Sequence, residues 1–119
     1  MYKAALKIYQ KDIKQWHSKY AGTLMSLSFC FNLQGKFEEG EQYSLEALRA
    51  DSSNYYIYTN LAAALLLQGK VGEAEKIYRQ YKDELKDSFL SDFDELDRFG
   101  VIPEARKADV ERIKAMLLE

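Results

Sequence analysis

The chain has one conceivable pairing of a nucleophile with a base, that of Cys30 with His17. A catalytic thiol needs a base or a cation beside it, because the thiolate is the nucleophile. Cys30 stands between Phe29 and Phe31, in an apolar stretch where a free thiol is expected to be buried as a small hydrophobic group. One histidine and one cysteine are also too few for a zinc site of three or four such ligands. We therefore expect no catalysis, no metal and no cofactor.

A second group that could carry chemistry is an acidic cluster near the C-terminus. Carboxylates placed together can act as general acid and base or can bind Ca²⁺. Phe89 and Phe93 are four residues apart, however, and this spacing places the cluster on a helix rather than in a calcium loop. Carboxylates near a helix N-terminus are favoured by the helix dipole, so we interpret these as solvated. The cluster comprises Asp92, Asp94, Glu95 and Asp97.

The bulk properties indicate one soluble domain. The chain has 119 residues, of which 47% are hydrophobic and 30% are charged. A net charge of −2 argues against nucleic acid, which is held mainly by Lys and Arg. No apolar run approaches the ~20 residues that span a bilayer, and the N-terminus lacks the apolar region of a signal peptide. With a single cysteine, the chain is expected in the reducing cytoplasm, without a membrane.

A four-residue word occurs twice in the chain. It is Leu-Gln-Gly-Lys, at Leu33–Lys36 and again at Leu67–Lys70. The same offset pairs Leu27 with Leu61, and two glutamates of the first copy with two of the second. A period of about 20 to 50 residues is typical of architectures in which one helical or β unit is stacked on copies of itself.

Apolar residues recur at steps of three and four, so the predicted fold is all-α. Gly35 and Gly69 each follow such a stretch and are expected to end a helix in the left-handed conformation. Asp87 is expected to begin a new helix as an N-cap, and Pro103 to open the last one. The helices are expected at about 2–13, 24–34, 37–50, 55–68, 71–85, 88–99 and 103–117.

The two central helix pairs resemble the tetratricopeptide repeat, whose period has the same length as the offset between the two words. The family has large and small apolar residues at fixed places in the first helix of each pair, and an aromatic followed by small residues in the second. Tyr81 stands where the family has a small residue, and the usual proline after the second helix is missing. The matching residues are Leu24, Leu27, Ser28, Phe31, Phe37, Gly40 and Ala47, then Tyr58, Leu61, Ala62, Leu65, Val71 and Ala74.

The resemblance implies an α-solenoid of helix-turn-helix hairpins, forming one structural domain. Residues 1–19 would be the second helix of a truncated upstream repeat with a linker, 20–54 the first repeat, and 55–87 the second. Residues 88–119 would be a pair of capping helices. Because the pattern starts in the middle of a unit, the chain is expected to be a C-terminal fragment of a longer protein with such repeats.

The resemblance also implies a concave groove lined by the first helix of each pair. The family's clamp for acidic tails uses Lys or Arg on this surface, and here only Asn60 matches it. A neutral, partly aromatic groove suits an apolar or aromatic peptide or helix. Its expected residues are Met25, Phe29, Asn32, Tyr56, Thr59, Asn60 and Ala63.

The expected function is therefore a non-catalytic scaffold that binds a protein or peptide. Two alternatives stay open. The segment is purely structural, forming the terminal repeats and cap of a protein whose activity lies in another domain, with the groove covered by the protein's own helices. Or the chain self-associates through an exposed apolar end formed by Tyr2, Leu6 and Tyr9.

Overall fold

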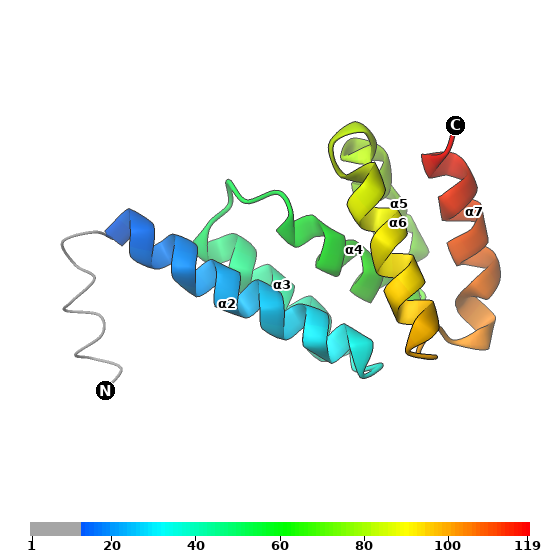
Figure 1. Cartoon of the computed structure of the whole chain (residues 1–119), viewed down its shortest axis with the longest axis horizontal. Helices are drawn as coiled ribbons and strands as arrows, with labels where there is room; N and C mark the ends of the chain where they lie inside the picture. The colour runs from blue at the N-terminus through cyan, green and yellow to red at the C-terminus, as the bar shows by residue number, and fades with distance from the viewer. Residues whose placement is uncertain (1–12) are drawn as a thin grey trace.

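The described part of the chain, residues 13–119 of the computed structural model, is helical throughout and contains no strand. Successive helices reverse direction along the chain (Figure 1). Helices α2, α4 and α6 contact one another on one side, and α5 contacts α7 on the other. The upstream helix and the self-association surface predicted within residues 2–13 lie almost wholly outside the described residues. The elements are α2 (Ile13–Leu33), α3 (Phe37–Ala50), α4 (Ile57–Leu67), α5 (Val71–Gln80), α6 (Lys82–Arg98), the 3₁₀ helix η2 (Glu104–Arg106) and α7 (Lys107–Leu117).

Three turns of the same geometry connect the helices in pairs. Gly35, Gly69 and Gly100 have φ values of 78°, 91° and 69°, which favour glycine because a Cβ is disfavoured there. After each glycine, a backbone amide reaches back to a carbonyl one turn inside the helix: Lys36 N to Phe31 O at 2.9 Å, Lys70 N to Leu65 O at 2.9 Å, and Val101 N to Leu96 O at 3.2 Å. The prediction that Gly35 and Gly69 lie at equivalent bends is confirmed, and Gly100 adds a third.

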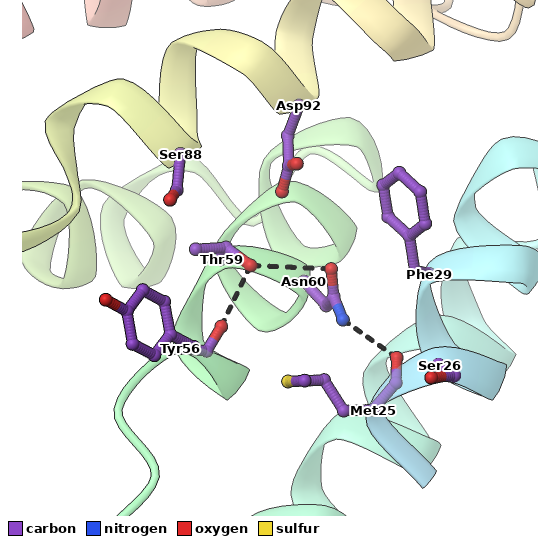
Figure 2. Close-up of a pocket in the computed structure, with 8 residues that line it drawn as sticks. All are labelled: Met25, Ser26, Phe29, Tyr56, Thr59, Asn60, Ser88 and Asp92. Carbon is purple, nitrogen blue, oxygen red and sulfur yellow. Dashed lines mark hydrogen bonds between the residues drawn. The ribbon is translucent and has the colours of Figure 1, made fainter. Parts of the chain in front are cut away.

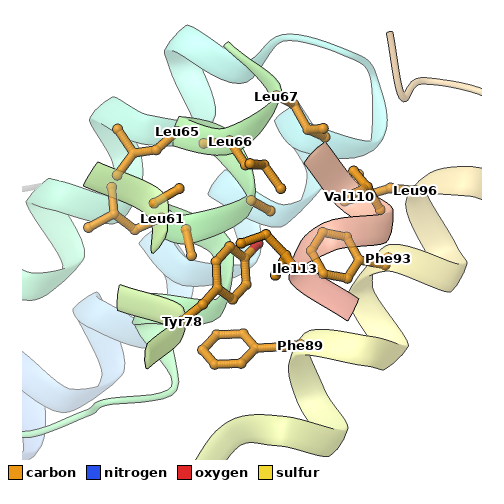
Figure 3. Packing of buried hydrophobic residues seen from close by; sticks show 14 of the residues in the cluster. Leu61, Leu65, Leu66, Leu67, Tyr78, Phe89, Phe93, Leu96, Val110 and Ile113 are labelled. Atoms are coloured by element: carbon orange, nitrogen blue, oxygen red, sulfur yellow. The ribbon is translucent and has the colours of Figure 1, made fainter. Parts of the chain in front are cut away.

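Helix α4 is the centre of the hydrophobic core. Every residue of this helix except Tyr58 is buried. Leucines of α4 pack against α5, α6 and α7, which contribute aromatic and branched side chains (Figure 3). The Tyr78 ring meets Phe89 edge-on at 4.7 Å and lies 5.6 Å from Phe93, measured between ring centroids. The C-terminal helix pair therefore buries the apolar face of α4 and α5.

The boundary between α5 and α6 differs from the prediction. The sequence predicted a fourth helix to about Leu85 and a new one from Asp87, but α5 ends at Gln80 and α6 already begins at Lys82. Leu85 and Phe89 are both buried at a spacing of four residues, so the apolar face runs through the expected N-cap. The break occurs at Tyr81, whose ring stacks on that of Tyr58 at 4.6 Å. The expected boundary at 87/88 consequently lies inside α6.

Helix α2 also differs from its prediction. It begins at Ile13, so the linker expected up to residue 19 is helical over 13–19. Leu27, which was expected on the apolar face, is 40% exposed, and the expectation that Cys30 is buried is wrong because its side chain is exposed. At the next helix, α4 starts at Ile57 rather than at the preceding tyrosines.

A buried set of amide and hydroxyl groups joins α2 to α4. The Asn60 side-chain nitrogen donates to the Met25 carbonyl and to the Ser28 hydroxyl, both at 2.9 Å. In the other direction, the Asn32 side-chain nitrogen donates to the Asn60 carbonyl at 3.1 Å. These contacts fix the position of α4 along α2. We call Ser28, Asn32 and Asn60 the amide joint.

Two glutamates at equivalent places of the two repeats make ion pairs to a later part of the chain. Glu41 on α3 pairs with Lys70 at 2.9 Å, and Glu75 on α5 pairs with Arg112 on α7 and with Arg79. Burial raises the pKa of Glu41, but its bonds with Lys70 and Gln68 outweigh this and leave the pKa lowered. The contact with Arg112 is the main cause of the lowered pKa of Glu75. The same position of the repeat therefore links one helix pair to the next in both copies.

Two helical glycines provide a matched test of how closely α3 approaches the amide joint. A Cβ on Gly40 would overlap the Asn32 amide oxygen, whereas nothing lies within 4 Å of a Cβ on Gly72. We expect Gly40→Ala to lower the free energy of unfolding by about 1–3 kcal/mol, because the amide joint must shift. Gly72→Ala should raise it by about 0.5–1 kcal/mol, since alanine favours helix. Urea denaturation measures both changes, and stabilisation by Gly40→Ala would contradict the close approach.

Candidate functional site

A pocket of about 270 Å³ opens between α2, α4 and α6. Helix α2 contributes one wall, the start of α4 the floor, and α6 the opposite wall (Figure 2). Helices α2 and α6 both contact α4, and they also contact each other. The pocket lies between these three helices. Its lining residues are Met25, Ser26, Phe29, Tyr56, Thr59, Asn60, Ser88 and Asp92.

Most of the groove residues expected from the sequence line this pocket. Met25, Phe29, Tyr56, Thr59 and Asn60 are all among its lining residues. The other two expected residues are not. Asn32 is 1% exposed and belongs to the amide joint, and Ala63 is 2% exposed within the core.

The α6 wall was missed by the sequence reasoning. Ser88 and Asp92 lie on α6, whose residues were assigned to a capping pair and not to the groove. Asp92 was interpreted from the sequence as a solvated member of the acidic cluster, and its buried Oδ2 atom contradicts this. Its place eight residues before Gly100 gave no signal for the pocket, because the equivalent residues Leu27 and Leu61 do not line it.

The aromatic part of the pocket is accessible. Tyr56 is 51% exposed, and its ring stacks on that of Tyr55 at 5.0 Å. This stacking restricts the Tyr56 ring without covering it. Phe29 is half-buried on the opposite side, and the Met25 side chain lies below it toward α4 (Figure 2). The pocket therefore offers two rings and a thioether to a ligand.

The polar groups of the floor are already engaged. Both hydrogens of the Asn60 amide nitrogen are used in the joint, at Met25 and Ser28. The Thr59 hydroxyl lies 2.9 Å from the Tyr56 carbonyl and 3.5 Å from the Asn60 amide oxygen. Asn60, expected as a ligand-binding residue, thus has a structural role that leaves no side-chain donor for a ligand.

Asp92 is the one lining residue that carries a charge. Its Oδ2 atom is buried and has no hydrogen-bond partner. Burial raises the pKa of this carboxyl from 3.8 to about 6, with Thr59 opposing the shift and Glu95 adding to it. The Asp92 charge also contributes, after burial, to the raised pKa of the Tyr78 hydroxyl. At neutral pH the pocket therefore holds a largely ionised and poorly solvated carboxylate.

The residues considered for catalysis are not brought together. Cys30 and His17 are both exposed and lie on one helix, where 13 residues correspond to about 20 Å. Among the described residues, no three acidic, histidine or cysteine side chains are grouped so that they could hold a metal ion. No helix in the described part of the chain has the length and apolar character needed to cross a membrane.

Comparison with known proteins returned no match: neither a protein-family model, nor a curated protein, nor a solved structure matches this chain.

The pKa of Asp92 generates a prediction for stability. As pH falls through about 6 toward 4, the Asp92 carboxyl takes up a proton in the folded state but not in the unfolded state. Protonation therefore stabilises the folded state over this range, and the carboxyl destabilises the fold only when it is ionised. Asp92→Asn should therefore raise the free energy of unfolding by about 1–3 kcal/mol above pH ~7. The difference from wild type should vanish near pH ~4. Chemical denaturation across this range measures it.

Asp94→Asn on the exposed side of α6 is the matched control for that series. Glu41 and Glu75, whose pKa values are lowered, contribute stability that is lost in acid, and this background is common to all the variants. A difference between Asp92→Asn and wild type that stays constant from pH ~4 to pH ~8 would show that Asp92 has an ordinary pKa.

Proposed function

We propose that this chain is a non-catalytic protein-interaction module of the tetratricopeptide type, an α-solenoid whose pocket binds a segment of a partner protein. The observation that carries the proposal is the pocket between α2, α4 and α6, which the half-buried Phe29 and the exposed Tyr56 line. Phe29 lies on α2, and Tyr56 directly precedes α4. A binding surface built on such helices needs little ordering when it meets its partner, which lowers the entropic cost of association.

The repeat geometry supports the assignment to this type. The two copies of the Leu-Gln-Gly-Lys word form the turns at Gly35 and Gly69, with the same hydrogen bond in each. Glu41 and Glu75 occupy equivalent places and each forms an ion pair to a later part of the chain. A third pair, α6 and α7, follows with the same turn at Gly100. The arrangement favours three stacked hairpins, about the number that a stable array needs.

The affinity for a single segment is expected to be moderate. A pocket of about 270 Å³ admits one or two side chains rather than a long helix. Interfaces below ~1,200 Å² are typical of transient complexes, so a dissociation constant in the micromolar range is expected. In such small interfaces, one or two aromatic residues usually carry most of the binding energy. Phe29 and Tyr56 are the candidates for that role.

A test that needs no known partner starts from peptides selected on the immobilised protein from a random display library. We expect Phe29→Ala combined with Tyr56→Ala to weaken their binding about 30-fold, because both rings lie at the pocket. Leu45→Ala is the matched control, since this side chain is 37% exposed on α3 and away from the pocket. Isothermal titration calorimetry measures the affinities, and thermal denaturation checks that each variant folds.

Amide chemical shifts during titration with the selected peptide locate the binding surface. Changes at Phe29, Tyr56 and Thr59 are expected. Changes confined to α3 and α5 would overturn the proposal. A large drop in melting temperature for the double variant would assign the two rings to packing instead, and would favour a purely structural role for the chain.

A further inference from the structure

The carboxylate of Asp92 occupies a place where the other two helix pairs have leucine. Counting back eight residues from each turn glycine gives Leu27, Leu61 and Asp92. Leu61 is 6% exposed and Leu27 is 40% exposed, so this place is apolar in both pairs and buried only in the central one. A charge at such a place costs stability unless a partner compensates it. The position of Asp92 therefore suggests that its charge serves recognition.

None of the groups facing Asp92 neutralises it. From α2 the pocket receives Met25, Ser26 and Phe29, which are uncharged, and the α4 side contributes only neutral groups. Glu95 on α6 and the buried Tyr78 hydroxyl on α5 are the titratable groups coupled to Asp92, and neither brings a positive charge. Among the residues that the structure describes, no Lys, Arg or His lines the pocket.

The remaining walls suit a cation as well as an apolar chain. Aromatic rings attract cations to their faces, and Phe29 and Tyr56 lie on opposite sides of the pocket (Figure 2). The Met25 thioether is polarisable and accommodates an alkyl chain. At about 270 Å³, the pocket has the volume of roughly nine waters at ~30 Å³ each, enough for an alkyl chain with a charged end.

The geometry of the carboxylate distinguishes between the two long basic side chains. The Asp92 Oδ2 atom is buried, so a ligand in the pocket cannot approach both oxygens of this carboxylate. A guanidinium group binds a carboxylate best through both oxygens at once. A carboxylate with one buried oxygen instead suits the compact ammonium group of lysine, which donates from one point.

We propose that the pocket binds a lysine side chain of the partner, with its ammonium group at the Asp92 carboxylate and its alkyl chain between Phe29 and Tyr56. This inference rests on the proposed function and names the chemistry of the partner. The apolar and aromatic character expected from the sequence remains, but the residue that anchors the partner is basic. An acidic tail, the ligand of the family's known clamp, would be repelled.

The test uses small probes that stand in for the side chain. We expect n-butylammonium to bind the full chain about fivefold more tightly than its neutral isostere 1-butanol at pH ~7.5 and constant ionic strength. Amide shifts at Met25, Thr59 and Ser88 follow the titrations. Asp92→Asn should abolish the preference, while Asp94→Asn should retain it. The preference should also fall several-fold near pH ~5, where Asp92 is mostly protonated.

A second measurement separates this inference from the proposed function. In the selected peptides, replacement of lysine by norleucine should weaken binding about tenfold to wild type and leave binding to Asp92→Asn unchanged. Peptides that bind at the pocket without any dependence on lysine would overturn the inference and leave the interaction module intact. Equal binding of butylammonium and butanol, or tighter binding of propylguanidinium, would also overturn it. Failure to select any peptide would instead count against the proposed function.

Discussion

The relative position of α2 and α4 depends on one amide group. The Asn60 side chain lies between the two helices and uses both of its hydrogens there, on the Met25 carbonyl and the Ser28 hydroxyl. Since these groups are buried, breaking the contacts would leave polar atoms without partners, at a cost of about 1–3 kcal/mol each. Leucines could bury as much surface but would permit α4 to slide along α2. The amide joint thus fixes the register of α4 along α2, and the core of α4 to α7 provides most of the apolar burial.

The pocket follows from this register. With α4 held on α2, the start of α4 presents Thr59 to the space that α6 then closes from the other side. In the core, the Tyr78 ring of α5 packs against Phe89 and Phe93 and so positions α6 against α5. Asp92, one residue before Phe93, is carried to the pocket by the same packing. The core and the pocket therefore use neighbouring residues of α6, and the Asp92 carboxylate is the member of that helix that we expect to weaken the fold.

Local sequence signals predicted the helices and turns, but the contacts between helices that are distant in the sequence were harder to predict. The glycines at 35 and 69 were identifiable because a left-handed turn favours that residue after an apolar stretch. Asp87 resembled an N-cap, yet the continuous apolar face through Leu85 and Phe89 outweighed it. Most groove residues of α2 and α4 were predicted because the repeat places them on one face. Asp92 was missed, since its place relative to the turn glycine matches Leu27 and Leu61, which do not line the pocket.

The exposed thiol of Cys30 has a practical consequence. It is the single cysteine of the chain, and it follows Phe29, a lining residue of the pocket. Thiol-selective reagents can therefore attach one fluorophore or spin label per molecule without any engineered mutation. Its attachment point on α2 is one residue away from the pocket wall, so the label would report on occupancy from close by. The side chain with the least evident role in the fold thus offers the simplest means of observing its function.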